Sequence, residues 1–196
     1  FTLSQIQAAI PRHCFQRSLM HSISYLLLDL VQIALLAWAA HTYIGKTDAL
    51  PEWSPFILWP AYVFCQGTIM TGVWVLAHEC GHQSFSDSEF WNNTFGTVLH
   101  SLLLVPYHSW RITHKRHHEN TGSCENDEVF APSTRADWGT DMLRETPLAQ
   151  CIGILLMLTV GWMPGYLVFG ITGPAKYRGK NVNHFSPTAA FFKPEE

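Results

Sequence analysis

The chain has 196 residues, of which 47% are hydrophobic and only 14% are charged, and its formal net charge is -3. Charged residues make up about a quarter of an ordinary soluble domain, so this composition argues against one and favours a membrane protein. No basic block interleaves with aromatic residues, and we therefore expect no nucleic-acid partner. The five cysteines show no CxxC spacing, so we expect reduced thiols, with Cys80 as a packing residue.

Two apolar runs in the first half of the chain predict membrane-spanning helices. Residues 23–40 carry a single charge, Asp29, and residues 56–77 carry none. Each run is long enough to cross a hydrocarbon core, which needs about 20 apolar residues. Residues 1–22 lack a signal-peptide pattern. We therefore expect a cytoplasmic segment over 1–22 and a transmembrane helical hairpin over 23–77.

Polar and apolar stretches alternate after the hairpin. Residues 78–150 are mostly polar, except for 95–106, which is short enough to be an interfacial or buried segment. Residues 151–171 are apolar, but two glycines and a proline between positions 161 and 165 predict a kinked or re-entrant element. Residues 172–196 are polar again.

Basic residues in short loops orient a membrane protein because they tend to stay in the cytoplasm. The basic residues that flank the predicted spans or lie between them are Arg12, Arg17, Lys46, Arg111, Lys115, Arg116, Arg135 and Arg144. Only one of them lies in the linker of the hairpin, so we expect residues 78–150 to face the cytoplasm. The tail is also basic, which predicts that residues 151–171 dip into the membrane without crossing it.

Histidine is the unusual feature of the composition, with eleven residues. Two clusters stand out: "HECGH", with His78 and His82, and "HKRHH", with His114, His117 and His118. Residues three or four apart lie on one face of a helix, so each cluster is expected to present its imidazoles together. Five imidazoles from two helical segments could converge on metal.

The other polar residues carry weaker signals. His100 and His108 lie between the clusters and are candidates for further ligands or for partners of the ligands. We interpret Asp127 and Glu128 as solvated or capping residues, in preference to partners of a ligand histidine. Asn92 fits a glycosylation sequon but is expected in a turn or helix cap. Core or surface roles are expected for His13, His21, His41 and His184.

The identity of the metal is left open by the donor type, because imidazole suits zinc, copper, iron and nickel. The first cluster fits H-E-x-x-H, in which Glu79 would be the general base of a zinc protease, but that interpretation leaves the second cluster largely unexplained. A site at the membrane surface instead suits a lipid chain as substrate. Removing hydrogen from an unactivated methylene requires a strong oxidant, which iron with dioxygen provides and zinc does not. The number of imidazoles indicates two ions.

Three stretches, "HECGHQSFS", "LLVPYHSWRITHKRHH" and "TGSCENDEVFAP", resemble the first and second histidine boxes and their flanks in membrane-bound fatty acid desaturases, the non-haem di-iron family. The stretches "IQAAIPRHCFQRS" and "GPAKYRGKNVNHFSP" resemble the microsomal delta-12 (oleate) branch, with the omega-3 branch close behind. The resemblance implies an all-α integral membrane protein of the endoplasmic reticulum, multi-pass, with histidine-rich segments facing the cytoplasm. It also implies the iron ligands His78, His82, His114, His117 and His118.

For the full-length protein the resemblance implies a reaction. Two His-bound iron ions, dioxygen, and electrons from cytochrome b5 and its NADH-dependent reductase would introduce a cis double bond into an acyl chain carried by phospholipid or coenzyme A. A hydroxylase or acetylenase of the same family would share these motifs. Phe64 and Trp74 could line the acyl tunnel, although plain lipid contact is the preferred interpretation for both.

One part of the family pattern is missing, because no third histidine box follows His118. We therefore expect the chain, which starts at Phe1, to be the N-terminal half of a longer enzyme, with residues 172–196 beginning the second half, and to be inactive alone. Besides the desaturase, two hypotheses from other classes remain: the zinc protease, and a catalytically silent membrane protein that keeps the histidines for binding or assembly.

Overall fold

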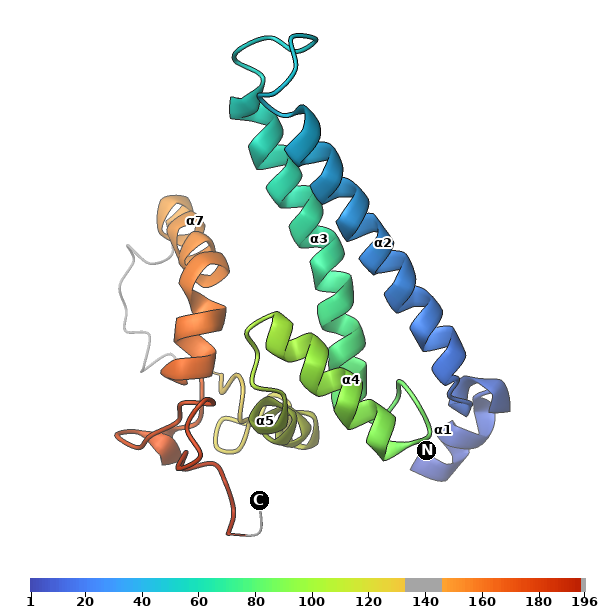
Figure 1. The fold of residues 1–196 in the computed structure, drawn as a ribbon. Coiled ribbons are helices and arrows are strands. Elements are labelled where there is room, and N and C mark those ends of the chain that lie inside the picture. The colour runs from blue at the N-terminus through green and yellow to red at the C-terminus, as the bar shows by residue number, and fades with distance from the viewer. Residues whose placement is uncertain (133–145, 195–196) are drawn as a thin grey trace. The chain divides into compact units, whose positions relative to one another are not determined.

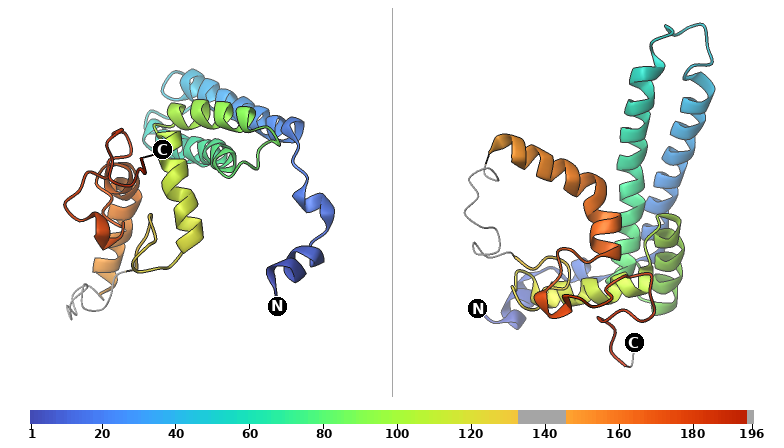
Figure 2. Two further views of the ribbon diagram at one scale, coloured as in Figure 1. Left: turned by 90° about the horizontal axis from the view of Figure 1, so that it is seen from below. Right: turned by 90° about the vertical axis from the view of Figure 1, so that its left-hand side faces the viewer.

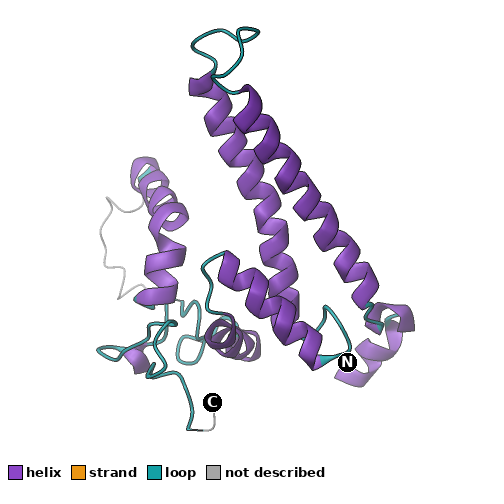
Figure 3. Cartoon of the chain, in the orientation of Figure 1, coloured by secondary structure: helices purple, strands orange, loops and turns teal. Residues whose placement is uncertain are grey.

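The computed structural model describes residues 1–132 and 146–194. Arg135 and Arg144, two of the residues used to orient the chain, lie outside these ranges. Every regular element within the described ranges is helical, as Figure 3 shows, and this confirms the expected all-α class.

The chain divides into two compact units, Phe1–Leu103 and Leu104–Glu196. The first unit is built on a long antiparallel helical hairpin, α2 and α3 (Figure 1). Its elements are α1 (Leu3–Ala9), the short 3-10 helix η1 (Arg12–Phe15), α2 (Leu19–Tyr43), α3 (Pro55–Gly81) and α4 (Glu89–Leu102).

Both hairpin helices are long and apolar enough to cross a membrane. At 1.5 Å per residue, the 27 residues of α3 extend for about 40 Å, against a hydrocarbon core of about 30 Å. The helices run past the apolar runs at both ends. Ser18 begins α2 by accepting a hydrogen bond from the backbone N–H of His21, and α3 continues through the first histidine cluster as far as Gly81. The excess length allows that cluster to lie at the edge of the apolar layer.

The core of the first unit joins α2, α3 and α4. It consists of Leu26, Val73, Ala77 and Leu99. Gly72 allows the two hairpin helices to approach closely, because a Cβ atom there would lie 2.8 Å from Oδ2 of Asp29. The one charged residue of the first apolar run therefore packs against the neighbouring helix.

Asn92 fastens the loop before α4 to the helix. It is 1% exposed, its Oδ1 accepts from the backbone N–H of Ser86, and its Nδ2 donates to the carbonyls of Ser86 and Ser88. Asn92 therefore has neither of the expected roles, because it lies inside the first turn of α4, whose N-cap is Ser88, and its side chain instead bonds to the preceding loop. The apolar segment 95–106 contributes Leu99 and His100, both of which α4 buries.

The second unit contains α5 (Tyr107–Asn120), α7 (Pro147–Leu156), the π-helix η3 (Met157–Val168) and the 3-10 helix η4 (Ala175–Tyr177). Helices α7 and η3 are continuous and form a third element long and apolar enough to cross a membrane. Its axis bends where α7 passes into η3 (Figure 2, right). Pro164 lies within η3, and a Cβ at Gly165 would lie 3.0 Å from the carbonyl oxygen of Val160. The predicted kink is confirmed, while the dip without crossing stays a prediction.

His184 from the tail lies in the core of the second unit. It is 5% exposed, and its Nδ1–H donates to the carbonyl of Leu167 at 3.1 Å. Its Nε2 lies 3.0 Å from the hydroxyl oxygen of Thr113, and that oxygen is 2.9 Å from the hydroxyl of Tyr166. Burial lowers the pKa of His184 to about 4, so the ring is neutral at pH 7. Its expected role as a core residue is confirmed.

Candidate metal centre

The first histidine pair is formed by the last turn of α3. His78 lies in this turn, and His82 directly follows the helix with its backbone still in the helical region. The spacing of four residues brings their Nε2 atoms to 2.9 Å from each other. Gln83, with φ of 60°, then turns the chain away from the helix axis, which is a common way to end a helix. The predicted pairing is therefore a local consequence of helix geometry.

Glu79 is engaged next to this pair. Its Oε2 accepts a hydrogen bond from the hydroxyl of Ser84 at 2.5 Å, and its backbone carbonyl accepts from the same residue. The carboxylate thus ties the end of α3 to the loop that follows. A zinc protease would instead need this carboxylate to bind a metal-bound water.

Two aromatic rings extend the first site. Trp74 lies against His78, with ring centroids 5.3 Å apart, and against His100, at 5.6 Å. His100 is fully buried, and burial lowers its pKa to about 4, which keeps the ring neutral. The preferred interpretation of Trp74 as a plain lipid contact is therefore wrong, because it packs between two histidines. Phe64 remains 76% exposed on α3, and Cys80 is fully buried there, as expected for a packing residue.

The second histidine pair lies on α5, in the second unit. His114 and His118 are four residues apart, and their Nε2 atoms are 3.1 Å from each other. Trp110 is 1% exposed and stacks on His114 with the ring planes 16° apart and the centroids at 4.5 Å. A buried indole thus limits the rotation of the first imidazole. His108 lies on the same helix and is exposed to solvent over part of its surface. The buried part of the ring and the nearby charge of Arg111 lower its pKa.

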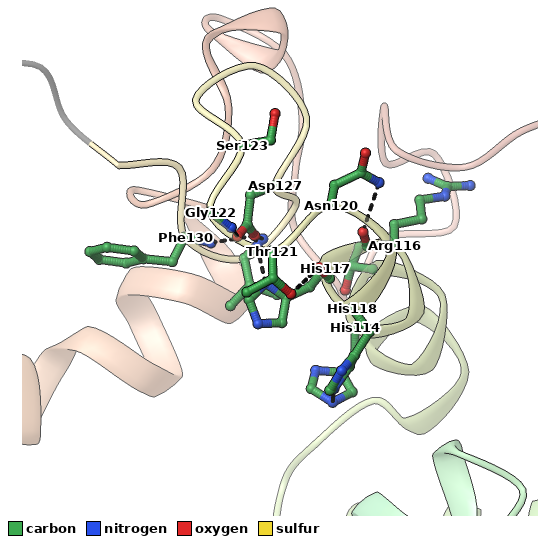
Figure 4. A network of polar contacts seen from close by, with 12 residues as sticks. His114, Arg116, His117, His118, Asn120, Thr121, Gly122, Ser123, Asp127 and Phe130 are labelled. Atoms are coloured by element: carbon green, nitrogen blue, oxygen red, sulfur yellow. Dashed lines mark hydrogen bonds and ion pairs between the residues drawn. The ribbon is translucent and has the colours of Figure 1, made fainter. Parts of the chain in front are cut away.

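His117 is held differently from the other two histidines of its cluster. Its ring centroid lies 5.8 Å from that of His114 and 5.5 Å from that of His118. Its Nδ1 is 2.7 Å from Oδ1 of Asp127, in the loop after α5 (Figure 4). Burial raises the pKa of Asp127, but hydrogen bonds from His117 and from backbone N–H groups, including that of Phe130, outweigh this and lower the pKa below its usual value.

Asp127 and Glu128 depart from the solvated role expected of them. They are only 1% and 7% exposed. Glu128 accepts from Nζ of Lys176 and from the hydroxyl of Tyr177, each at 2.9 Å, and so ties the loop to the tail. The expected capping role holds for Asp127, which accepts from the backbone N–H groups of Val129 and Phe130. Asp127 also bonds to His117, a proposed ligand, which was the alternative that the sequence favoured less. The neighbouring sequence offers no clear signal of the burial of the two acids, since Phe130, two residues after Glu128, is itself 59% exposed.

Both pairs fit the requirements of a metal with imidazole ligands. Two nitrogen ligands that each lie about 2.1 Å from one ion, with an angle of about 90° between the two metal–nitrogen bonds, would lie about 3 Å apart. The observed separations of the Nε2 atoms are 2.9 and 3.1 Å. All four histidines offer ligand atoms. Each pair therefore offers two nitrogen ligand atoms at a separation that one ion can bridge, which suits a borderline metal such as iron or zinc.

Known proteins resemble this chain along its whole length. The family model for fatty acid desaturases matches residues 51–194. A Delta(12) acyl-lipid conjugase (11E,13E-forming) of Momordica charantia is 44% identical over all of this chain and 48% of its own length. A Delta(12)-acyl-lipid-desaturase of Punica granatum is 49% identical over 88% of this chain and 44% of its own.

An omega-6 fatty acid desaturase of the endoplasmic reticulum (isozyme 1) from Glycine max is 43% identical over all of this chain and 49% of its own length. The chain thus spans about half the length of the curated relatives it matches. No solved structure gives a significant match. The family match covers both histidine clusters, the loop with Asp127 and most of the tail, and the chain belongs to the fatty acid desaturase family.

Proposed function

We propose that the protein acts as an acyl-lipid desaturase that introduces a cis double bond at the delta-12 position, converting oleate to linoleate. The observation that carries the proposal is the pair of facing Nε2 atoms on each of two helices, 2.9 and 3.1 Å apart, in a chain of the desaturase family. Relatives named for delta-12 activity support the position of the bond.

The proposed centre holds two iron ions. The ligands contributed by this chain are His78, His82, His114, His117 and His118. Iron with dioxygen supplies the oxidising power that an unactivated methylene requires, which zinc lacks. Two hydrogens leave adjacent methylenes, and dioxygen is reduced to two waters with two further electrons and two protons. The histidines bind the ions, and Trp74 and Trp110 hold His78 and His114 in orientation.

The two further electrons are proposed to come from NADH through a reductase and cytochrome b5. A surface cavity of about 510 Å³ beside α5 supports an acidic electron-transfer partner. Its lining residues are His108, Arg111, Ile112, Lys115, Arg116, Glu119 and Lys193. Because exposed charges are screened by salt, electron transfer to the enzyme should slow as ionic strength rises.

The proposed location is the membrane of the endoplasmic reticulum, with both histidine clusters on the cytoplasmic side. Three apolar helices and the names of relatives support the membrane and the compartment. Cys124 is exposed in the loop after α5 and offers a test of sidedness. A variant that keeps only this cysteine should react with a membrane-impermeant maleimide in sealed microsomes. Labelling only after detergent is added would reverse the orientation.

The activity is tested with the full-length protein in a yeast that makes oleate but no linoleate. Gas chromatography of cellular fatty acids should show a new linoleate peak. Because one relative is named a conjugase, the same traces should be searched for 11,13-conjugated products. Product only from supplied linoleate would indicate omega-3 activity. No product, with protein in the membrane, would overturn the proposal and direct attention to zinc content and proteolysis.

The metal ligands are tested one at a time. Replacing any of the five proposed ligands with Ala should abolish linoleate and lower the iron content of the purified protein. His13→Ala is the matched control, because His13 is exposed near the N-terminus. A variant that keeps both product and iron would remove that histidine from the ligand set.

A further inference from the structure

The Asp127 carboxylate is surrounded by hydrogen-bond donors. Its Oδ1 accepts from Nδ1 of His117 at 2.7 Å and from the backbone N–H groups of Val129 and Phe130 at 3.0 Å each. Its Oδ2 accepts from the backbone N–H of Gly122 at 3.0 Å (Figure 4). With 1% of its surface exposed, the carboxylate is a fixed part of the loop.

This arrangement determines which nitrogen of His117 carries the proton. Backbone N–H groups can only donate, so they hold both carboxylate oxygens as acceptors. The His117 nitrogen that faces Oδ1 must therefore be the donor. A neutral imidazole with its proton on Nδ1 has its lone pair on Nε2, which is the form needed to bind a metal through Nε2.

The loop also fixes the orientation of the His117 ring. The hydroxyl of Thr121 donates to the His117 carbonyl at 2.8 Å, so the chain turns back directly over the end of α5. Gly122, with φ of +80°, adopts the left-handed backbone that this turn requires. The backbone N–H of Asp127 donates to the Ser123 carbonyl and closes the loop. The carboxylate is therefore anchored independently of His117.

We propose that Asp127 is a positioning residue that holds His117 in the Nδ1–H tautomer and directs its Nε2 toward iron. The inference rests on the proposed function, in which His117 is an iron ligand. Glu128 provides the contrast within the same loop, because it is also buried but bonds to Lys176 and Tyr177. Carboxylates that orient ligand histidines typically contribute 10- to 100-fold in metal affinity or activity.

The test uses the full-length enzyme, purified in detergent with iron, and compares Asp127→Ala, Asp127→Asn and Glu128→Gln. The readouts are the rate at which a chelator removes iron, the Mössbauer spectrum of the 57Fe-loaded protein, and linoleate formation. We expect Asp127→Ala to release iron about 10- to 100-fold faster, and Asp127→Asn, which keeps a weaker acceptor, to lie between it and wild type. Glu128→Gln should keep wild-type spectra and iron retention.

A double-mutant cycle separates positioning from general loop stability. If Asp127 acts through His117, adding Asp127→Ala to His117→Ala should not speed iron release further. If Asp127→Ala speeds iron release as much in the His117→Ala background as it does in wild type, the inference is overturned. It is also overturned if Asp127→Ala retains iron as well as Glu128→Gln does. Asp127→Asn serves the same comparison where the Ala variant does not fold. Wild-type protein that binds no iron would instead overturn the proposed function, and this inference with it.

Discussion

His184 should make the stability of the protein depend on pH between about 4 and 6.5. Its pKa is lowered from 6.5 to about 4 by burial. Above pH 6.5 neither the folded nor the unfolded state protonates this ring, and below about 4 both states do. Between these values only the unfolded state binds the proton, so the free energy of unfolding falls as the pH falls. The difference of about 2.5 pKa units corresponds to a loss of about 3 kcal/mol.

The assay compares wild type with His184→Asn, which does not titrate. Thermal unfolding in detergent, followed by tryptophan fluorescence, would be measured at pH 7.5 and 4.5. At pH 7.5 the variant should melt lower, because it loses the contacts of His184 with Thr113, Tyr166 and Phe191. At pH 4.5 about 2.5 kcal/mol of the pH-dependent loss in wild type is already present, so the gap should narrow by about 5 to 10 °C for a protein of this size.

Groups that titrate in both proteins cancel in this comparison, including the histidine pairs. His13→Asn, at an exposed position, is the control and should differ from wild type by the same amount at both pH values. A gap between wild type and His184→Asn that does not change with pH would refute the reasoning, because it would mean that the ring is protonated equally easily in the folded and unfolded states.

Two further substitutions test local geometry. Gly170→Ala should lower the melting temperature more than Gly179→Ala: both glycines have positive φ, but a Cβ at Gly170 would lie 2.7 Å from Cγ2 of Val182, whereas Gly179 has nothing within 4 Å. Left-handed backbone costs an alanine about 1 kcal/mol at either position, and the overpacking against Val182 should add about 1 to 3 kcal/mol at Gly170 alone. Equal losses of melting temperature in the two variants would contradict the close contact with Val182. Glu79→Gln should keep most linoleate formation in the yeast assay, because the side-chain amide carbonyl of the glutamine can still accept a hydrogen bond from Ser84. A variant that loses all activity but retains its metal would favour a role of Glu79 as a general base.

The parts of the site that depend on local geometry could be predicted from the sequence. A separation of four residues on a helix determines that His78 lies near His82 and that His114 lies near His118, whatever surrounds the helices. The two N-terminal spans were predicted for the same reason, because length and hydropathy along one segment are sufficient. The irregular geometry of η3 also has a local cause, because Pro164 lies within this helix and lacks the backbone N–H that an α-helix needs.

The roles of the two adjacent carboxylates could not be predicted in this way. Asp127 and Glu128 are neighbours in the sequence, yet one bonds to the helix before the loop and the other to Lys176 and Tyr177, some fifty residues later. Burial of such groups is stable only when partners satisfy them, and those partners depend on how the tail folds. Trp74 was misjudged for a related reason, since its neighbour His100 comes from another helix.

Helix α5 is therefore supported by segments that hold no proposed metal ligand. On one side the loop after it fixes His117 through Asp127. The tail contacts the same helix through His184, whose carbonyl accepts from Ser109, and through the carbonyl of Phe191, which accepts from Arg116. A substitution in either segment can thus change how the second histidine cluster is presented without removing a ligand. Changes in the tail should affect the whole cluster through the position of the helix, whereas a change at Asp127 should affect the loop and His117 without moving His114 or His118.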